Sequence, residues 1–428
     1  MRLYRMNSMI EELIDFTKEK FGLGNYYLEQ HSIYRNVNIF NITVYTLCME
    51  WFPNHVAEQE DDDSNPEGTA VIEINVNTRK FERAIFVMGK TYAKDGITFV
   101  NLDTNNIIKW IEQETGLTYG KQFQLHKEEE GELHFKECID GVAVSPSGYI
   151  EIRFDKKGNL TLLSVHGQFP SKEIVKEETY TLSLEIVEQL AKEQLKLVEY
   201  PSYEKKQLFP VYGIEEIYVT NDQISTIPFE FFADVRSHLE INKTMHWDEP
   251  INKPFEREEI RWIEEVSIEQ ALLCVPSPDS LPITKVEQEK CVMAVKDFLR
   301  QEYPNDTGKW ILITLHRDKR YIHAILKENQ QDNRVFQRKI KLIIDANSLK
   351  AVNYMDNKSM LETFGQFQAP EKVMITKEEA YGKIKEMFEL EPYYVYDFEQ
   401  KKYVLCGKLD CQYGVNAVSG EAISLDDL

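Results

Sequence analysis

Two histidines and two glutamates in the first half of the chain have a spacing that could bring metal ligands together. Residues 123–137 read as two short strands joined by a loop that ends in Gly131, which fits a β-hairpin with a bulge. That register places His126 opposite His134, with carboxylates on the same face. Two imidazoles and a carboxylate are a ligand set that binds zinc. The ligands that this pattern nominates are His126, His134, Glu128 and Glu132.

The alternative interpretation of this hairpin is a polar strand face that only meets solvent. Polar residues at alternate positions are ordinary on the solvated face of an antiparallel sheet. The sequence therefore favours no bound metal and no cofactor, with the four residues above as the ligands if a metal binds. His316 and His323 bracket a second predicted hairpin turn and are weaker candidates.

Cys406 and Cys411 are the cysteine pair whose spacing could matter. They flank Gly407-Lys408-Leu409-Asp410, which we interpret as a hairpin loop, so the two thiols are expected on neighbouring strands. A C-x4-C pair without a second Cys or His pair is weak support for zinc. Six cysteines in 428 residues do not form a disulfide framework, and we expect reduced thiols.

Local catalytic signatures are missing from the sequence. It contains no H-E-x-x-H, no G-x-S-x-G and no Rossmann fingerprint. Gly116 to Lys121 resembles a phosphate-binding loop, but it is one residue short and follows a predicted helix. Within the acidic stretch 58–68, residues 61–65 resemble the start of a calcium loop, but Pro66 stands where Gly is needed, so we expect a solvated loop. These observations predict a protein that is not an enzyme.

The net charge of −22 limits the classes of partner. Nucleic acids and anionic membranes attract basic surfaces, so neither is expected to bind. No apolar run approaches the roughly 20 residues of a membrane helix. The first residues turn acidic at Glu11 and contain no apolar core of a signal peptide, from which we expect a cytoplasmic protein.

The elements that must position these residues follow a recurring pattern. Thr284 with Glu287, and Thr376 with Glu379, form the Thr-x-x-Glu capping box at the start of two predicted helices. Short runs rich in Val, Ile, Tyr and Phe follow each helix, separated by turn residues. Short gaps favour antiparallel hairpins, because parallel pairing needs a long crossover. The predicted unit is one helix packed on an antiparallel β-meander.

The ends of these predicted strands also recur. Val415 begins V-N-A-V-S-G-E-A-I, Ile344 begins I-D-A-N-S-L-K-A-V, and Ile74 begins the fainter I-N-V-N-T. A helix and meander with this ending resemble a PepSY domain, whose last strand ends in a D-A-x-T-G-E-like turn. Leu349 replaces the Gly of that turn in the earlier copy. The residues that match in the last copy are Asn416, Ala417, Ser419, Gly420 and Glu421.

The whole chain resembles multi-PepSY proteins of the YcdB type. The resemblance implies an association with a peptidase, because PepSY domains are thought to restrain peptidases or to stabilise partners. It also implies export or membrane tethering, a pattern that the acidic N-terminal residues do not match.

We expect an α+β fold of repeated helix-plus-meander units with no parallel sheet. Residues 1–175 would hold two faint units, and residues 176–283 a third, irregular unit with a Pro-rich connector. Residues 284–370 and 371–428 would each form one PepSY-like unit.

The function expected from these features is non-catalytic binding or scaffolding of a protein partner, such as a peptidase-like protein that it modulates. Repeated sheets present edges whose backbone groups can pair with an added strand. The alternatives are a hydrolase or metalloenzyme whose site is built from distant residues, and a small-ligand-binding protein. A deep pocket with clustered titratable groups would favour an enzyme over a binding protein.

Overall fold

The computed structural model describes residues 2–55, 65–100, 102–223, 225–229, 237–262, 264, 266–329 and 333–427. Most of the predicted acidic loop at 58–68 lies outside them. Three β-sheets and seven α-helices form the described part. No helix in these ranges is both long and apolar enough to span a membrane.

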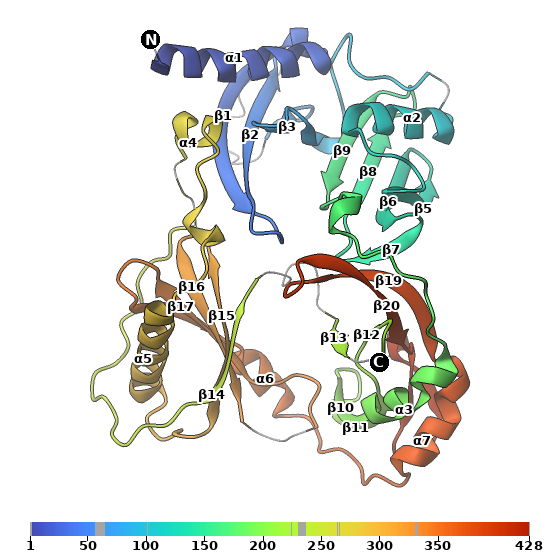
Figure 1. The fold of residues 1–428 in the computed structure, drawn as a ribbon, viewed down its shortest axis with the longest axis vertical. Helices are drawn as coiled ribbons and strands as arrows, with labels where there is room; N and C mark the ends of the chain where they lie inside the picture. Colours follow the sequence, from blue (N-terminus) through green and yellow to red (C-terminus); the bar gives the residue numbers. More distant parts are fainter. Residues whose placement is uncertain are drawn as a thin grey trace.

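The largest sheet has 13 strands and combines segments from both ends of the chain. Helices α1 (Arg2–Lys20) and α2 (Thr104–Thr115) cover one face of its N-terminal part (Figure 1). Their apolar residues recur at helical spacing and pack on the alternate, inward residues of the strands. The strand order is β1 (Tyr26–Val37), β2 (Thr43–Pro53), β3 (Ala70–Asn75), β4 (Phe81–Phe86), β9 (Leu160–His166), β8 (Tyr149–Phe154), β6 (Glu132–Ile139), β7 (Val142–Ser145), β19 (Glu389–Asp397), β20 (Lys402–Asp410), β12 (Ile217–Thr220) and β13 (Thr226–Pro228), and β5 (Phe123–Glu129) pairs with β6.

The prediction of a fold without parallel pairing is wrong, because β7 runs parallel to β19. Ala143 pairs with Tyr393 and Ser145 with Val395. The prediction considered only strands joined by short turns, which must be antiparallel. Strands from segments far apart in the chain can pair in either direction, so the large sheet is mixed.

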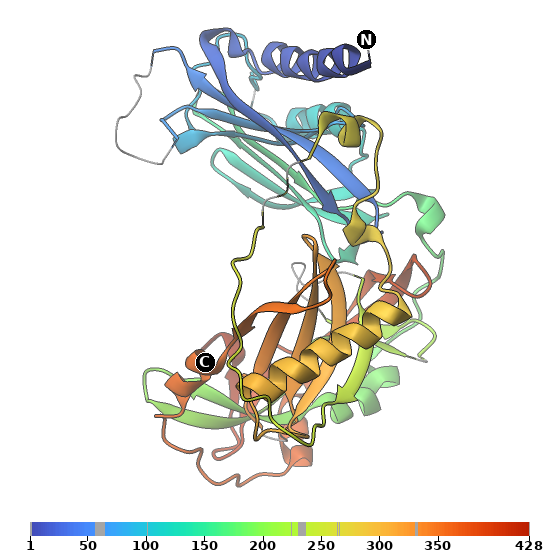
Figure 2. The same ribbon diagram turned by 90° about the vertical axis from the view of Figure 1, so that its left-hand side faces the viewer.

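A five-stranded antiparallel sheet forms a second layer with α5 (Lys285–Glu302). The predicted capping box at Thr284 is confirmed, because its side chain and that of Glu287 each accept from the other's backbone N–H group. Helix α5 lies across one face of the sheet, on apolar residues such as Leu312 and Leu342 (Figure 2). The strand order is β14 (Leu239–Thr244), β15 (Trp310–Asp318), β16 (Tyr321–Glu328), β17 (Lys339–Asp345) and β18 (Ala351–Asp356).

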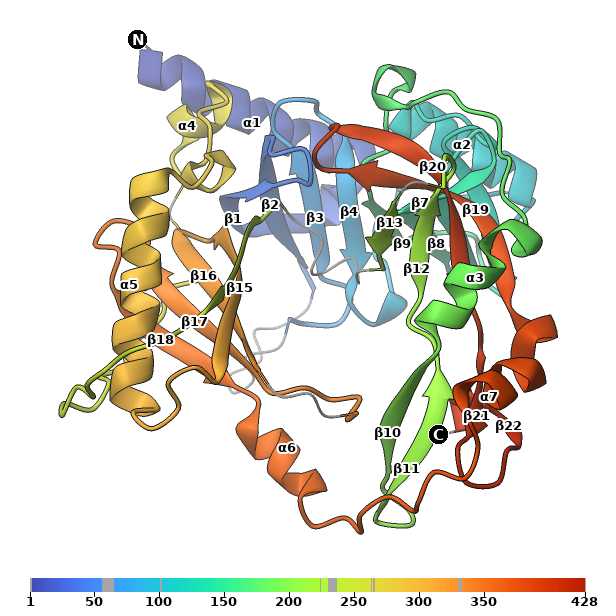
Figure 3. The ribbon, with the colours of Figure 1, turned by 60° about the horizontal axis from the view of Figure 1, so that its bottom comes forward.

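A third sheet of four strands lies with α3 (Leu184–Gln194) and α7 (Lys377–Ile384) at the end of the molecule opposite α1 (Figure 1). The capping box predicted at Thr376 is confirmed at the start of α7. The β10–β11 hairpin stands between the five-stranded sheet and α7, and α6 (Lys358–Phe364) leads the chain across below it (Figure 3). The strand order is β10 (Lys196–Ser202), β11 (Gln207–Gly213), β21 (Tyr413–Asn416) and β22 (Ala422–Ser424).

The recurring strand endings of the sequence form one kind of hairpin turn. In each, Oδ1 of an Asn or Asp accepts the backbone N–H groups two and three residues later, as an Asx turn does. The residue four positions on donates its N–H to the carbonyl of that Asn or Asp and has positive φ: 57° at Arg79, 57° at Leu349 and 74° at Gly420. A positive φ explains why Gly suits this position. The Asx residues are Asn75, Asp345 and Asn416.

The cysteine pair does not lie on neighbouring strands as predicted. Gly407 to Asp410 continue β20, so there is no hairpin loop between the two thiols. Cys406 and Cys411 are both buried, and they pack in different apolar clusters. They are five positions apart along an extended chain, an odd separation that places their side chains on opposite faces.

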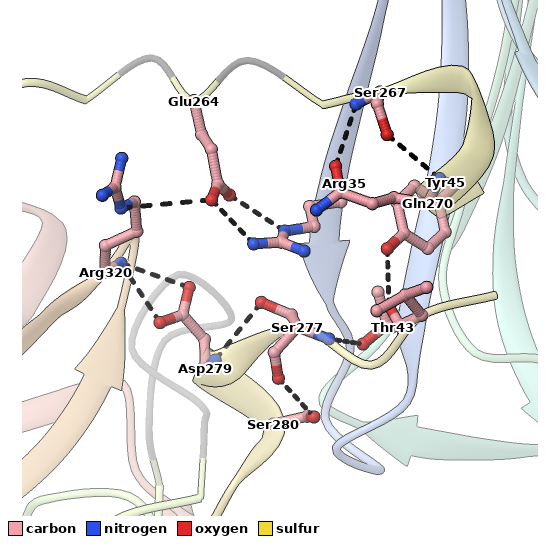
Figure 4. A network of polar contacts seen from close by, with 11 residues as sticks. Arg35, Thr43, Tyr45, Glu264, Ser267, Gln270, Ser277, Asp279, Ser280 and Arg320 are labelled. Carbon is pink, nitrogen blue, oxygen red and sulfur yellow. Dashed lines mark hydrogen bonds and ion pairs between the residues drawn. The ribbon is translucent and has the colours of Figure 1, made fainter. Parts of the chain in front are cut away.

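A polar connector joins the N-terminal strands to the five-stranded sheet and carries α4 (Ile268–Leu272), as Figure 4 shows. Glu264 accepts two hydrogen bonds from Arg35 of β1, at 2.9 Å from Nε and 2.7 Å from Nη2. Asp279 Oδ1 accepts the backbone N–H of Arg320, in the β15–β16 turn, at 3.1 Å. The connector therefore ties the two sheets together.

One carboxyl group is buried close to the parallel pair. Glu137 of β6 is 1% exposed and accepts hydrogen bonds from the backbone N–H groups of Gly148 (2.9 Å), Gln168 (3.3 Å) and Phe169 (2.7 Å). A Cβ at position 148 would collide with this carboxylate, so the close approach requires glycine. Glu137 thus ties the β7–β8 turn to the segment after β9.

Burial opposes the charge of Glu137 more than its three N–H donors favour it, and raises its pKa from 4.5 to about 7. The native state therefore binds more protons than the unfolded chain between these two pH values. The stability that Glu137 contributes is fully present below its pKa in the unfolded chain. It is lost as the pH rises through its pKa in the folded protein. We predict that Glu137→Gln removes this loss, on the order of 3 kcal/mol in the free energy of unfolding.

The measurement is urea unfolding of wild type and Glu137→Gln at several pH values from 4 to 8. Glu130→Gln, at an exposed loop position, is the control and should follow the wild type. Parallel curves for wild type and Glu137→Gln would contradict the prediction.

Candidate functional site

The predicted histidine hairpin forms, with a different register from the expected one. Strands β5 and β6 pair as expected at Leu125 and Phe135, but a bulge between Leu125 and Lys127 shifts the rest by one residue. Lys127, and not His126, therefore lies opposite His134. The bulge sits within the strand, whereas the sequence analysis placed it in the loop.

His134 meets carboxylates from its own strand and from β8 on the other side. It pairs with Glu151 in register, and its Nε2 contacts Oε1 of Glu132. Glu132, His134 and Glu151 each offer one possible ligand atom, and these three atoms lie within 4.8 Å of one another. All three residues are half-buried. Of the predicted ligands this group brings together His134 and Glu132, and it adds Glu151.

His126 and Glu128 do not join this group. Both are exposed, and Glu128 accepts a hydrogen bond from Thr104 Oγ1 at 2.8 Å. Loss of some hydrating water beside the sheet, followed by the positive charges of Lys136 and a protonated His134, lowers the pKa of His126.

Arg153 already neutralises the carboxylates of the three-residue group. Its Nη2 lies 2.6 Å from Glu151 Oε1 and 3.2 Å from Glu132 Oε1. A guanidinium in that position repels a divalent cation and occupies the oxygens that would bind it. The arrangement is a salt-bridge network on a sheet face, and it could hold a metal only if Arg153 moved away.

The second histidine pair forms an aromatic stack. His316 and His323 lie directly opposite each other on β15 and β16, with ring centroids 5.1 Å apart. Trp262 also stacks on His323, with ring centroids 6.3 Å apart, and His323 is fully buried. These contacts are typical of packing.

A groove for which the sequence carries no local signal lies between the β10–β11 hairpin and residues 333–337, which precede β17. Its volume is about 690 Å³. Its residues come from four distant segments of the chain, so no local motif could have revealed it. The β10 groove is lined by Leu195, Lys196, Leu197, Val198, Tyr200, Tyr212, Gly213, Ile214, Glu215, Lys327, Asn333, Arg334, Val335, Gln337, Lys377 and Leu425.

Strand β10 is an edge strand, and a short piece of the chain already pairs with it. The Glu199 N–H donates to the carbonyl of Asn333 at 2.6 Å, and the Val335 N–H donates to the carbonyl of Glu199 at 3.2 Å. Arg334 thus forms a parallel bridge to Glu199. Among the described residues, Glu199 is the only β10 position whose backbone bonds to an element other than β11.

No protein-family model matches this chain, and no curated protein matches its sequence. Among solved structures it is similar to the Bacillus megaterium YpeB C-terminal domain, at 9% sequence identity and a TM-score of 0.25, over 81% of this chain and 96% of that one. A TM-score this low does not establish a shared fold. The PepSY relationship stays a resemblance.

We predict that removing Arg153 exposes a latent zinc-binding group. A hydrogen bond to a charged group contributes about 1.5–3 kcal/mol, so Arg153→Ala should raise zinc affinity roughly tenfold over the wild type. His134→Ala in the Arg153→Ala background should abolish the gain. The measurement is calorimetric zinc titration of each purified variant.

Arg83→Ala is the matched control, because Arg83 pairs with Glu73, also in the large sheet, at 3.5 Å and does not touch the group. Equal zinc binding by the wild type and Arg153→Ala would show that the guanidinium does not govern the site.

Proposed function

We propose that this protein is a non-catalytic binding protein that holds an extended segment of a protein partner along β10. The observation that carries the proposal is the pairing of Glu199 with residues 333–335. It supports strand addition because the chain itself adds a short strand to this edge. The PepSY resemblance of the sequence adds a peptidase-like protein as the class of partner.

The backbone of β10 offers further pairing positions next to that bridge. Along a strand, successive residues direct their backbone N–H and C=O groups alternately to the neighbour on one side and to the neighbour on the other. Leu197 therefore points its N–H and C=O groups the same way as Glu199. Pro201 is the next residue whose backbone faces away from β11. Its missing N–H group therefore removes no hydrogen bond to β11. Leu197 lines the groove, so a segment lying there would meet its backbone.

A groove that combines apolar walls with an open strand edge suits binding. A catalytic role would need a nucleophile, a base and a stabilising group converging on one point. Among the described residues, the lining includes no His, Cys or Ser. We therefore propose recognition without chemistry.

We predict that Leu197→Pro weakens binding of an extended peptide. The probes are three octapeptides with blocked ends, in which Val alternates with Glu, Gln or Lys, and wild type should bind at least one. Loss of one backbone hydrogen bond, worth about 1 kcal/mol net, should weaken the tightest of them roughly fivefold or more. Fluorescence anisotropy measures the dissociation constants.

Leu197→Ala keeps the N–H group and is the matched control, with thermal unfolding of all variants as the check on folding. Unchanged affinity of a folded Leu197→Pro protein would refute strand addition at β10. Binding of none of the three peptides to wild type would do the same.

A further inference from the structure

The β10 groove carries positive charge in a strongly acidic protein. The described residues of its lining include four cationic side chains and one carboxylate, Glu215. The whole chain has 50 Lys and Arg against 72 Asp and Glu. We infer that the groove selects an acidic segment of the partner, an inference that rests on the strand addition proposed above. The cationic residues are Lys196, Lys327, Arg334 and Lys377.

Contacts within the protein leave the charges of Lys196 and Lys377 available to a ligand. Lys196 lies 3.5 Å from Glu215, and both side chains are mostly exposed, at 57% and 82%. Exposed pairs of this kind are weak and exchange readily. Lys377 donates to the backbone carbonyl of Glu193 at 3.1 Å, an acceptor that carries no net charge.

The walls of the groove also match an alternating segment. Apolar residues such as Leu197, Tyr212 and Val335 share the lining with the four cations. Successive side chains of an extended strand point to opposite faces. A segment that alternates apolar and acidic residues therefore offers both kinds of side chain to a lining that holds apolar and cationic residues.

The test compares the three octapeptides on the wild type and on one double variant. The Glu peptide should bind tightest and the Lys peptide weakest. Lys196→Gln with Lys327→Gln should weaken the Glu peptide roughly threefold to tenfold and leave the Gln peptide unchanged. These two lysines are chosen because Lys377 begins α7 and the backbone of Arg334 pairs with β10.

Lys156→Gln with Lys157→Gln is the matched control. Both residues lie in the exposed turn between β8 and β9, so this variant changes the net charge equally without touching the groove. Its affinity for the Glu peptide should equal that of the wild type. Raising the salt concentration should weaken the Glu peptide and not the Gln peptide, since screening acts only on charge.

The outcomes separate the two proposals. Equal affinity of the Glu and Gln peptides, with loss of both in Leu197→Pro, would overturn the acidic preference and keep strand addition. A Glu preference that survives Leu197→Pro would overturn strand addition, and with it the inference as stated. Binding of a thymidine octanucleotide as tightly as the Glu peptide would also overturn it, because the groove would then recognise any polyanion.

Discussion

The parallel pairing of β7 with β19 is the contact on which the architecture depends. It merges a sheet built from the first 170 residues with β19 and β20 from the last 40 residues, and through β20 with β12 and β13, into one layer of 13 strands. Only three residue pairs make the junction, so its side chains must contribute as well. Val144 of β7 packs with Tyr396 and Tyr403 in one apolar cluster, and Tyr403 is fully buried. Burial of such large rings supplies stabilisation that a short ladder of hydrogen bonds cannot.

Glu137 holds β7 in the place where this junction can form. Its carboxylate binds the turn that follows β7 and the segment that follows β9, so both are fixed relative to β6. A carboxyl group in this position is a compromise. Its hydrogen bonds are satisfied, but its negative charge is removed from water, which is unfavourable at neutral pH. The geometry of the junction is kept at the expense of some stability.

Local features of this fold could be predicted from the sequence, and long-range ones could not. The capping boxes at Thr284 and Thr376 formed because a box needs only residues within one helical turn. The turn at Asn416 likewise depends on an Asx side chain and a Gly a few residues apart. The β7–β19 pair and the bridge at Glu199 join segments with no shared pattern, so periodicity carries no trace of them.

The candidate sites show the same division. Sequence spacing identified the hairpin that carries His134, but a one-residue bulge changed which side chains meet it. Glu151 and Arg153 come from β8, which no spacing rule connects to the histidine. The β10 groove was missed because its cations are far apart in the chain and each is unremarkable alone.

The charge of the groove and the charge of the whole chain act over different distances. At physiological salt the Debye length is about 8 Å, so most of the −22 net charge is screened from a ligand within the groove. The groove lysines would lie within one Debye length of a bound segment, so less of their charge would be screened from it at physiological salt. An acidic segment is therefore repelled weakly on approach and attracted on contact. Weak repulsion at long range slows association, whereas attraction at short range favours a ligand that fits the groove closely. Selectivity would therefore arise from the fit of the ligand to the strand edge, the apolar residues and the cations.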